Sequence, residues 1–242
     1  MENHKRSIFE KKRIYFFGII ESYMEFIGLL ILIASVILHE IMHGYVAEKL
    51  GDPTARHAGR ITLNPIPHID PLMTILLPGV LLLSGSPIIF GAAKPVPVNP
   101  LFLKDGRKDM ALVALAGPLT NLALAAIAAI LFAVLYPQLN LYEVSMFIQT
   151  GLFSFNEATA VIYILSTVVF LNIVLGVLNL IPIPPLDGSK LFSIIFPEEI
   201  ALKYLSLAPF GLFMLFALLY LTPLRNWFSA LIIQALRLFG AF

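Results

Sequence analysis

The chain has 242 residues, of which 59% are hydrophobic and only 13% are charged. Soluble domains carry roughly 25% charged residues, so this composition predicts an integral membrane protein whose apolar surface faces a lipid bilayer. The net charge of +1 excludes the basic face of a nucleic-acid-binding protein, and the lack of cysteine excludes disulfides and thiolate metal ligands.

Residues 1–25 form a basic, amphipathic N-terminal segment. This segment lacks the compact apolar core and small-residue cleavage site of a signal peptide, and Glu21 interrupts its apolar run. We therefore expect a helix that lies at the membrane interface. The first membrane segment follows, from Phe26 to about Leu50, and the helix-stopping sequence GDP ends it.

The first membrane segment carries the sequence HEIMH, in which His39, Glu40 and His43 stand where apolar residues are expected. Residues four apart lie on one face of a helix, so the two histidines can bind one metal ion with Glu40 beside it. Such a pair suits zinc, whose catalytic sites use three protein ligands and leave a position for water. The metal lowers the pKa of that water, and an adjacent carboxylate accepts its proton. Ionisable groups are costly in a membrane segment, which favours a functional site over polar packing between helices.

Further apolar segments predict an all-α, polytopic bundle of about four to six transmembrane segments. Leu72–Phe90 is broken by proline and glycine, so it is expected to re-enter the membrane or to span it poorly. Met110–Tyr136 and Ala158–Ile181 are long enough to cross a hydrocarbon core of about 30 Å. Lys203–Leu221 and Leu224–Phe242 are the other expected segments. A short extended or re-entrant loop associated with the membrane completes the predicted fold.

Charge placement predicts the orientation of these segments. The loop from Lys94 to Asp109 carries several basic residues, whereas Pro137–Glu157 carries no lysine or arginine. By the positive-inside rule the first loop is cytoplasmic and the second is external. The end of Ala158–Ile181 then reaches the cytoplasmic side together with the sequence NLIPIPPLDGSK. The basic N-terminus would also prefer the cytoplasm, and this conflict leaves the direction of the first segment open.

A third metal ligand is expected downstream of HEIMH. Asp187 lies in NLIPIPPLDGSK, where prolines prevent a regular helix and Gly188 permits a tight turn. The broken end of a membrane segment can direct this carboxylate into a protein-lined cavity. Asp187 fits equally well as the cap of a helix that begins at Gly188. His57 and His68, in a loop rich in glycine and proline, are weaker alternatives.

Two other stretches carry hypotheses of their own. In AKPVPVNP, Pro95 and Pro97 leave one edge of an extended strand without N–H groups. Lys94, Val96 and Val98 keep their N–H groups on the other edge. We hypothesise that this second edge binds an unwound substrate segment, and a rigid surface loop is the alternative. The stretch ALAGPLTN is rich in small residues that permit close helix packing, with Asn121 as a candidate donor behind the metal site.

Taken together, these stretches resemble the site-2 protease family of intramembrane zinc metalloproteases, of the peptidase M50 type. The matching pieces are HEIMHGYVAEKLGD, GRITLNPIPHIDP, FGAAKPVPVNP, ALAGPLTN and NLIPIPPLDGSK, which run in family order over residues 34–191. The resemblance is to the compact form of the family, without PDZ or CBS modules. No stretch is polar enough and long enough to form a separate soluble domain, so we expect a single metalloprotease domain over residues 1–242, with residues 1–25 outside the matched region.

The resemblance also implies roles for particular residues. It implies one catalytic zinc ion on His39, His43 and Asp187, with Glu40 as the catalytic acid and base. It places Asn179 near the substrate or the oxyanion, where an amide can donate to a developing negative oxygen. A hydrogen bond between helices is the alternative for Asn179.

These inferences predict a multi-pass zinc metalloendopeptidase of the cell or inner membrane. Its substrate is expected to be a membrane protein, cleaved in or near a transmembrane helix as in regulated intramembrane proteolysis. The site is expected nearer the cytoplasmic side. The alternative is a metal-ion transporter or a metal-binding membrane scaffold. No nucleic-acid partner is expected, and the existence of a regulatory membrane partner is left open.

Overall fold

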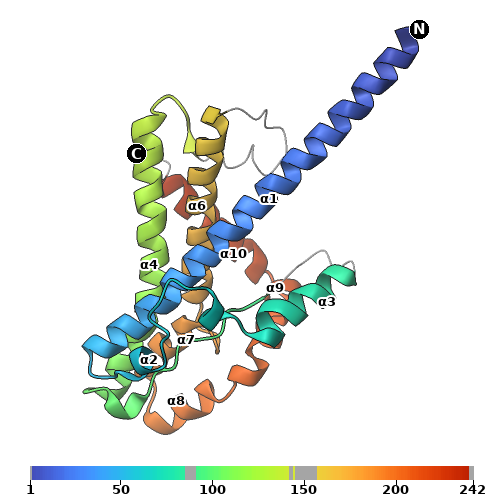
Figure 1. Ribbon diagram of the computed structural model, residues 1–242. Helices are drawn as coiled ribbons and strands as arrows, with labels where there is room; N and C mark the ends of the chain where they lie inside the picture. The colour runs from blue at the N-terminus through green and yellow to red at the C-terminus, as the bar shows by residue number, and fades with distance from the viewer. Residues whose placement is uncertain (1, 85–90, 142–143, 145–156, 240–242) are drawn as a thin grey trace.

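Figure 1 shows the computed structural model, which describes residues 2–84, 91–141, 144 and 157–239. Within these ranges every regular element is a helix, which confirms the predicted all-α fold class. The α-helices are α1 (Glu2–Lys49), α2 (Thr54–His57), α3 (Leu77–Leu83), α4 (Gly106–Leu135), α6 (Glu157–Asn179), α7 (Asp187–Phe192), α8 (Glu198–Leu205), α9 (Gly211–Leu221) and α10 (Leu224–Phe239). Short 3₁₀ turns occupy Ile66–His68, Pro100–Phe102, Ser193–Ile195 and Ala208–Phe210, and a π-helical turn occupies Pro71–Leu76.

Three of the described helices are long and apolar enough to cross a bilayer. They are Phe26–Lys49, Gly106–Leu135 and Ala160–Asn179, and they confirm three of the segments expected from the sequence. The remaining apolar helices are shorter. Helix α9 has 11 residues, and at 1.5 Å per residue it covers only about 16 Å, roughly half of a hydrocarbon core.

The N-terminal segment is continuous with the first membrane segment. The sequence predicts a separate interfacial helix over residues 1–25, whereas α1 runs from Glu2 to Lys49 without a break. No proline interrupts this stretch, so the backbone has no reason to end one helix and start another. The first part of α1 therefore extends beyond the other helices, away from α2 and α8 (Figure 1).

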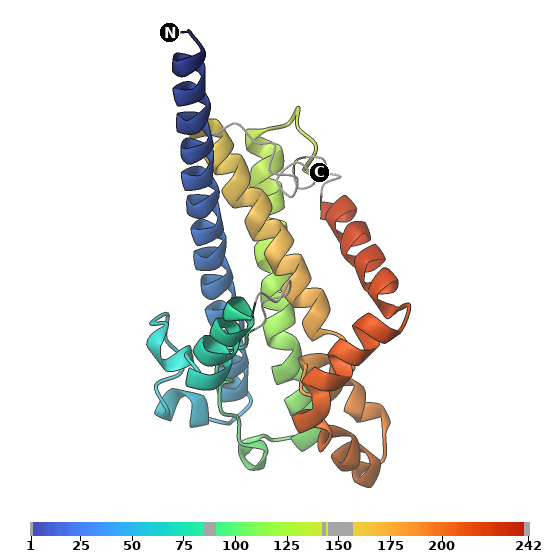
Figure 2. The same cartoon turned by 90° about the vertical axis from the view of Figure 1, so that its right-hand side faces the viewer.

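The core lies between α4 and α6, which cross side by side in both ribbon views (Figures 1 and 2). Alanines such as Ala125 and Ala129 on α4 are fully buried and face Val169 and Ile173 of α6 in one apolar cluster. Small residues let two helix backbones approach closely, and this close packing stabilises helix pairs in a bilayer. Leu236 of α10 adds to the same cluster.

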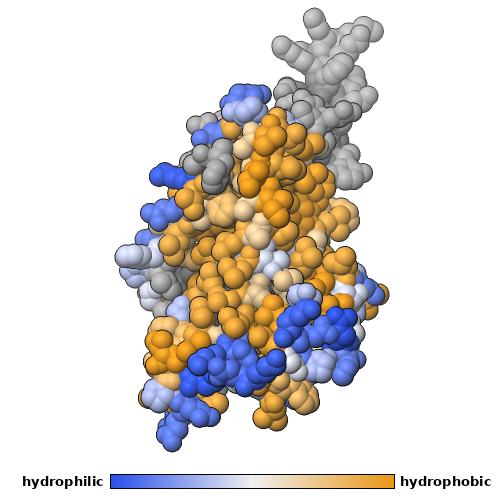
Figure 3. Space-filling model, turned by 90° about the vertical axis from the view of Figure 1, so that its left-hand side faces the viewer, coloured by the Kyte–Doolittle hydropathy of each residue, from blue (hydrophilic) through white to orange (hydrophobic). Residues whose placement is uncertain are grey.

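Apolar and polar surfaces are separated along the bundle. Figure 3 shows an apolar band over the body of the molecule, with hydrophilic residues at its lower end and along one edge of this view. Large apolar side chains on α4, such as Ile127 and Val134, are 62% and 72% exposed, as expected for side chains that face lipid. The lower end is also where α2, α7 and α8 lie (Figure 1). The chain is thus an integral membrane protein whose lower end carries polar residues.

Candidate metal centre

His39, His43 and Asp187 converge at the lower end of the bundle. The two histidines stand one turn apart on α1, and Asp187 opens α7. The Nε2 atoms of the histidines lie 3.0 Å apart, and Asp187 Oδ2 lies 3.1 Å from each of them. All three side chains are buried. Among the described residues, these three side chains form the group with metal-binding atoms close enough together to hold one ion.

The donor set fits zinc. Both histidines turn Nδ1 away from the cluster, His43 toward Val113 O and His39 toward Asn121 Oδ1, each at 2.6 Å. A proton on each Nδ1 satisfies these acceptors and leaves each Nε2 with a lone pair. Two lone pairs and a carboxylate oxygen at one point repel one another unless a cation lies between them. A tetrahedral zinc ion with bonds of about 2.0–2.1 Å sets its ligands roughly 3.4 Å apart, close to the observed triangle.

Gly117 allows α4 to pass directly against this cluster. A Cβ atom at this position would lie 2.4 Å from His39 Nε2 and 2.5 Å from His43 Nε2. These separations are far shorter than any van der Waals contact, so only glycine leaves room for the ligand atoms. The small-residue stretch ALAGPLTN therefore packs against the helix that carries the histidines, as its composition predicts.

The chain between α6 and α7 brings Asp187 to the histidines. Gly188 makes the turn possible, because a Cβ there would lie 2.2 Å from Leu180 O. Asp187 is the first residue of α7, and Leu186 holds the cap position without a side-chain hydrogen bond. The alternative that Asp187 caps a helix beginning at Gly188 is therefore wrong. Its Oδ2 faces the histidines, and Lys190 Nζ lies 3.1 Å from its Oδ1.

Glu40 contacts the extended segment AKPVPVNP. Its Oε2 accepts a hydrogen bond of 2.7 Å from Val96 N–H. Lys94 N–H likewise donates to His68 O at 2.9 Å, so two donors on the edge that the sequence assigns to substrate already have partners within the chain. Val98 N–H donates to no other residue in the described ranges.

Asp52 anchors the far end of this segment. Its Oδ2 accepts a hydrogen bond of 2.6 Å from Asn99 N–H, and its Oδ1 accepts from Thr54 N–H. Burial disfavours the charged carboxylate, but the hydrogen bonds from Thr54 and Asn99 outweigh it and hold the pKa of the Asp52 carboxyl below its usual value. The segment is therefore held at both ends by the loop that follows α1.

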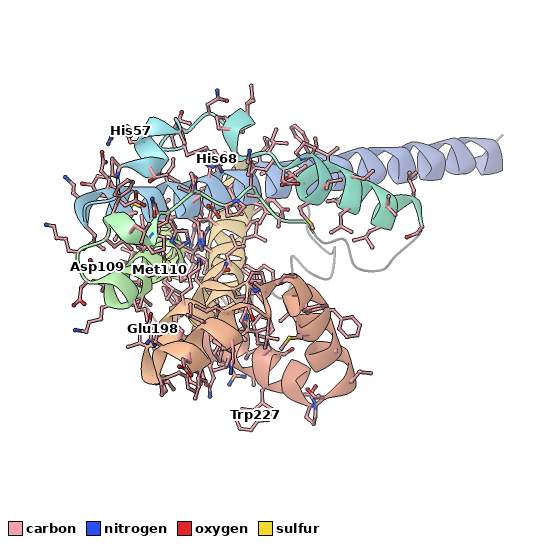
Figure 4. The ribbon with its side chains drawn as sticks, turned by 90° about the horizontal axis from the view of Figure 1, so that it is seen from below. His57, His68, Asp109, Met110, Glu198 and Trp227 are labelled. Atoms are coloured by element: carbon pink, nitrogen blue, oxygen red, sulfur yellow. The ribbon has the colours of Figure 1, made fainter. Side chains whose placement is uncertain are left out.

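Other candidates lie outside the cluster. His68 contacts Thr62 O through Nε2 at 3.0 Å, and neither it nor His57 joins the metal cluster. Figure 4 shows both histidines on the opposite side of α1 from Asp109 and Met110 of α4. They are wrong as alternative ligands because they belong to the loop outside α1, whereas the cluster faces α4. Asn179 donates to Leu175 O of its own helix at 3.0 Å, and its role near the substrate stays a prediction.

Two buried polar residues, Asn172 and Ser35, were not anticipated from the sequence. Asn172 of α6 is fully buried and bonds both to Asn121 of α4 and to Ser35 of α1. The available signal was a polar side chain inside an apolar membrane segment. Only the packing of the three helices shows that these residues meet behind His39.

Comparison with known proteins agrees with this geometry. The sequence profile of Peptidase family M50 matches residues 27–220, well over half of the chain. The chain belongs to peptidase family M50. It is 39% identical over 198 residues to YwhC of Bacillus subtilis, a protein designated a zinc metalloprotease, with 81% of this chain and 80% of YwhC covered.

More distant M50 relatives carry the same designation. The chain is 29% identical over 204 residues to Rip2 of Mycobacterium tuberculosis, covering 83% of this chain and 69% of the relative. It is 30% identical over 175 residues to MJ0611 of Methanocaldococcus jannaschii, covering 71% and 72%. No solved structure gives a significant match. This M50 protein is thus a zinc metalloendopeptidase of the site-2 protease type, which favours the peptidase over the transporter or scaffold alternative.

Proposed function

We propose that this M50 peptidase is an intramembrane endopeptidase that hydrolyses a peptide bond in or near a transmembrane segment of another protein. One zinc ion is held by His39, His43 and Asp187, and Glu40 is the catalytic acid and base. The observation that carries the proposal is the convergence of two histidine nitrogens and a carboxylate oxygen at 3.0–3.1 Å, buried within a membrane bundle.

Zinc held by these three side chains would acidify a water molecule and polarise the scissile carbonyl. Glu40 accepts the proton of the attacking water on its carboxylate and returns it to the nitrogen of the leaving amine. His43 is kept in one orientation by its bond to Val113 O. Lys190, whose Nζ lies 3.1 Å from Asp187 Oδ1, offsets the carboxylate charge on the side away from the histidines.

The extended segment at 94–99 is the proposed site for the unwound substrate. A helix must open before its peptide bond can be attacked, and a free backbone donor can then pair with a substrate carbonyl. Val98 N–H is free for this pairing among the described residues, whereas Val96 N–H is bound to Glu40 and would have to exchange partners. Asn179 is the proposed oxyanion donor, once its amide leaves Leu175 O.

The proposed location is the cell or inner membrane, with the site nearer the cytoplasm. The basic loop before α4 and the metal cluster lie at the same end of the bundle, and basic loops remain on the cytoplasmic side. The proposed partner is a membrane protein with a transmembrane helix. A regulatory membrane partner stays open.

Mapping the cleavage site tests this proposal. The purified peptidase in proteoliposomes is given a model protein with one transmembrane helix, and the products are identified by mass spectrometry. We expect cleavage in or near the hydrophobic segment, lost with a zinc chelator and restored by added zinc. Cleavage confined to soluble tails, or cleavage that survives the chelator, would contradict the proposal.

A further inference from the structure

We propose that Asn172 is a positioning residue that determines which ring nitrogen of His39 faces the metal. The inference rests on the proposed metal site and adds to it a residue of α6 that touches neither the metal cluster nor Glu40. It acts through Asn121, along a chain of buried hydrogen bonds that crosses α1, α4 and α6.

The chain of contacts is continuous. His39 Nδ1 lies 2.6 Å from Asn121 Oδ1, and Asn121 Nδ2 donates to Asn172 Oδ1 at 2.8 Å. Asn172 Nδ2 donates to Ser35 Oγ and to Val168 O, each at 2.9 Å. Asn121 and Asn172 have no exposed surface, and Ser35 is 5% exposed. Buried polar groups of this kind need partners, because an unpaired one has lost its hydrogen bonds to water without replacing them.

The donor-to-acceptor direction of these hydrogen bonds is set at the end of the network on α6, at Val168. The two ends of an asparagine amide have the same shape, so contacts between asparagines alone fit either way round. Val168 O removes the ambiguity, because a backbone carbonyl only accepts. Asn172 must therefore turn its NH₂ toward Val168 and its oxygen toward Asn121.

The orientation of Asn172 determines which ring nitrogen of His39 carries the proton. With Asn172 Oδ1 facing it, Asn121 must present its own NH₂ to α6 and its oxygen to His39. That oxygen accepts only if His39 carries its proton on Nδ1, which leaves Nε2 with the lone pair that a metal needs. In the reversed arrangement the proton would stand on Nε2, inside the cluster, and would block the ligand position.

His43 does not need such a relay. Its Nδ1 faces Val113 O directly, and a backbone carbonyl cannot be reversed. His39 faces a side-chain amide instead, which is why a second asparagine and a carbonyl of α6 are required. Such outer partners fix the orientation of histidine ligands, and removing one typically costs about 10–100-fold in metal affinity.

The test measures zinc affinity by chelator competition, together with the visible spectrum of the cobalt-substituted protein, which reports on the ligands. Asn172→Leu keeps the branching and the number of heavy atoms of the side chain and removes the amide, so we expect at least about a tenfold loss of zinc affinity and an altered cobalt spectrum. Ser166→Ala is the matched control, because Ser166 is buried on the same helix and, within the described part of the chain, its hydroxyl bonds only to Ile162 O of that helix. Asn172→Ala replaces the leucine variant if that variant does not accumulate.

A rescue separates positioning from simple packing. In the double variant Asn121→Asp with Asn172→Leu, both carboxylate oxygens accept, so the direction no longer has to be set. We expect it to regain most of the lost affinity and the wild-type cobalt spectrum. Wild-type affinity in Asn172→Leu, or no recovery in the double variant, would overturn the inference. If Asp187→Asn binds zinc as tightly as wild type, it is the proposed metal site that fails instead.

Discussion

At the residue scale, the metal cluster depends on the absence of a side chain as much as on its ligands. Gly117 places the backbone of α4 where a methyl group would lie 2.4 Å from His39 Nε2. Protein interiors relieve such overlaps by shifting side chains and backbone, at a cost of about 1–3 kcal/mol. Here the side chains that would move are His39 and His43, so an added methyl group would weaken metal binding.

Gly117→Ala should therefore leave the protein folded and strip it of zinc. We expect metal analysis to find well under one zinc per chain, while the helical circular dichroism stays at the wild-type level. Gly79→Ala on α3 is the control, because a Cβ there meets nothing within 4 Å. Full zinc occupancy in Gly117→Ala would show that α4 can withdraw from the cluster.

At the element scale, the segment at 94–99 connects Glu40 to the loop that follows α1. Its bonds with Glu40, Asp52 and His68 fix it alongside the helix that carries the histidines. Arg60 adds a further bond from Nη2 to Lys94 O at 2.5 Å. Because the proposed substrate edge includes a donor that already binds Glu40, this segment links substrate binding to the catalytic carboxylate.

Val96→Pro removes the N–H that donates to Glu40 and that lies on the proposed substrate edge. We expect cleavage of a transmembrane model substrate to fall by about tenfold or more, since a lost hydrogen bond to a charged group is worth about 1.5–3 kcal/mol. Zinc content should not change. Val96→Ala keeps the N–H and serves as the control, and equal cleavage by Val96→Pro and wild type would refute the pairing hypothesis.

Asp52 gives the same segment a dependence on pH. The pKa of its carboxyl is lower in the folded protein than in the unfolded chain, so its contribution to stability is complete above the unfolded pKa of about 3.9. That contribution is lost as pH falls through the lower folded pKa. Asp52→Asn should reduce the melting temperature at pH 7, by the equivalent of about 1–3 kcal/mol, and the difference from wild type should shrink below about pH 4.

The control for that experiment is Asp105→Asn, since the Asp105 side chain is 63% exposed and its ion pair with Lys108 is at the surface. Surface pairs contribute about 0–1 kcal/mol, so its melting temperature should match wild type at both pH values. A constant difference between Asp52→Asn and wild type from pH 7 to pH 3 would argue against a charged Asp52 as the anchor.

At the scale of the whole molecule, the sequence was most informative where the chemistry is local. The spacing of HEIMH predicts two ligands on one helix face, and apolar length predicts the three long helices. Asp187 lies 144 residues beyond His43. The residues alone left it balanced between ligand and helix cap, because only the packing of α4 against both α1 and α7 decides which way its carboxylate points.

Other features could not be read from hydropathy. The predicted segments after residue 203 are apolar, but α9 ends after 11 residues. Hydropathy along the sequence does not show where a helix ends within an apolar stretch. The hydrogen bonds of Asn172 depend on which faces of α1, α4 and α6 meet. Conversely, the break expected near residue 25 does not occur, because nothing in the local sequence opposes a continuous α1.

Glu40 is proposed to act as the acid and base at a zinc site to which it contributes no ligand. Zinc content and cleavage of a model transmembrane substrate, measured together on wild type and Glu40→Gln, test it most directly. We predict equal zinc content in both proteins and a loss of cleavage of at least about 100-fold in Glu40→Gln, the scale of general acid–base catalysis. Equal rates of cleavage by the two proteins would contradict the account.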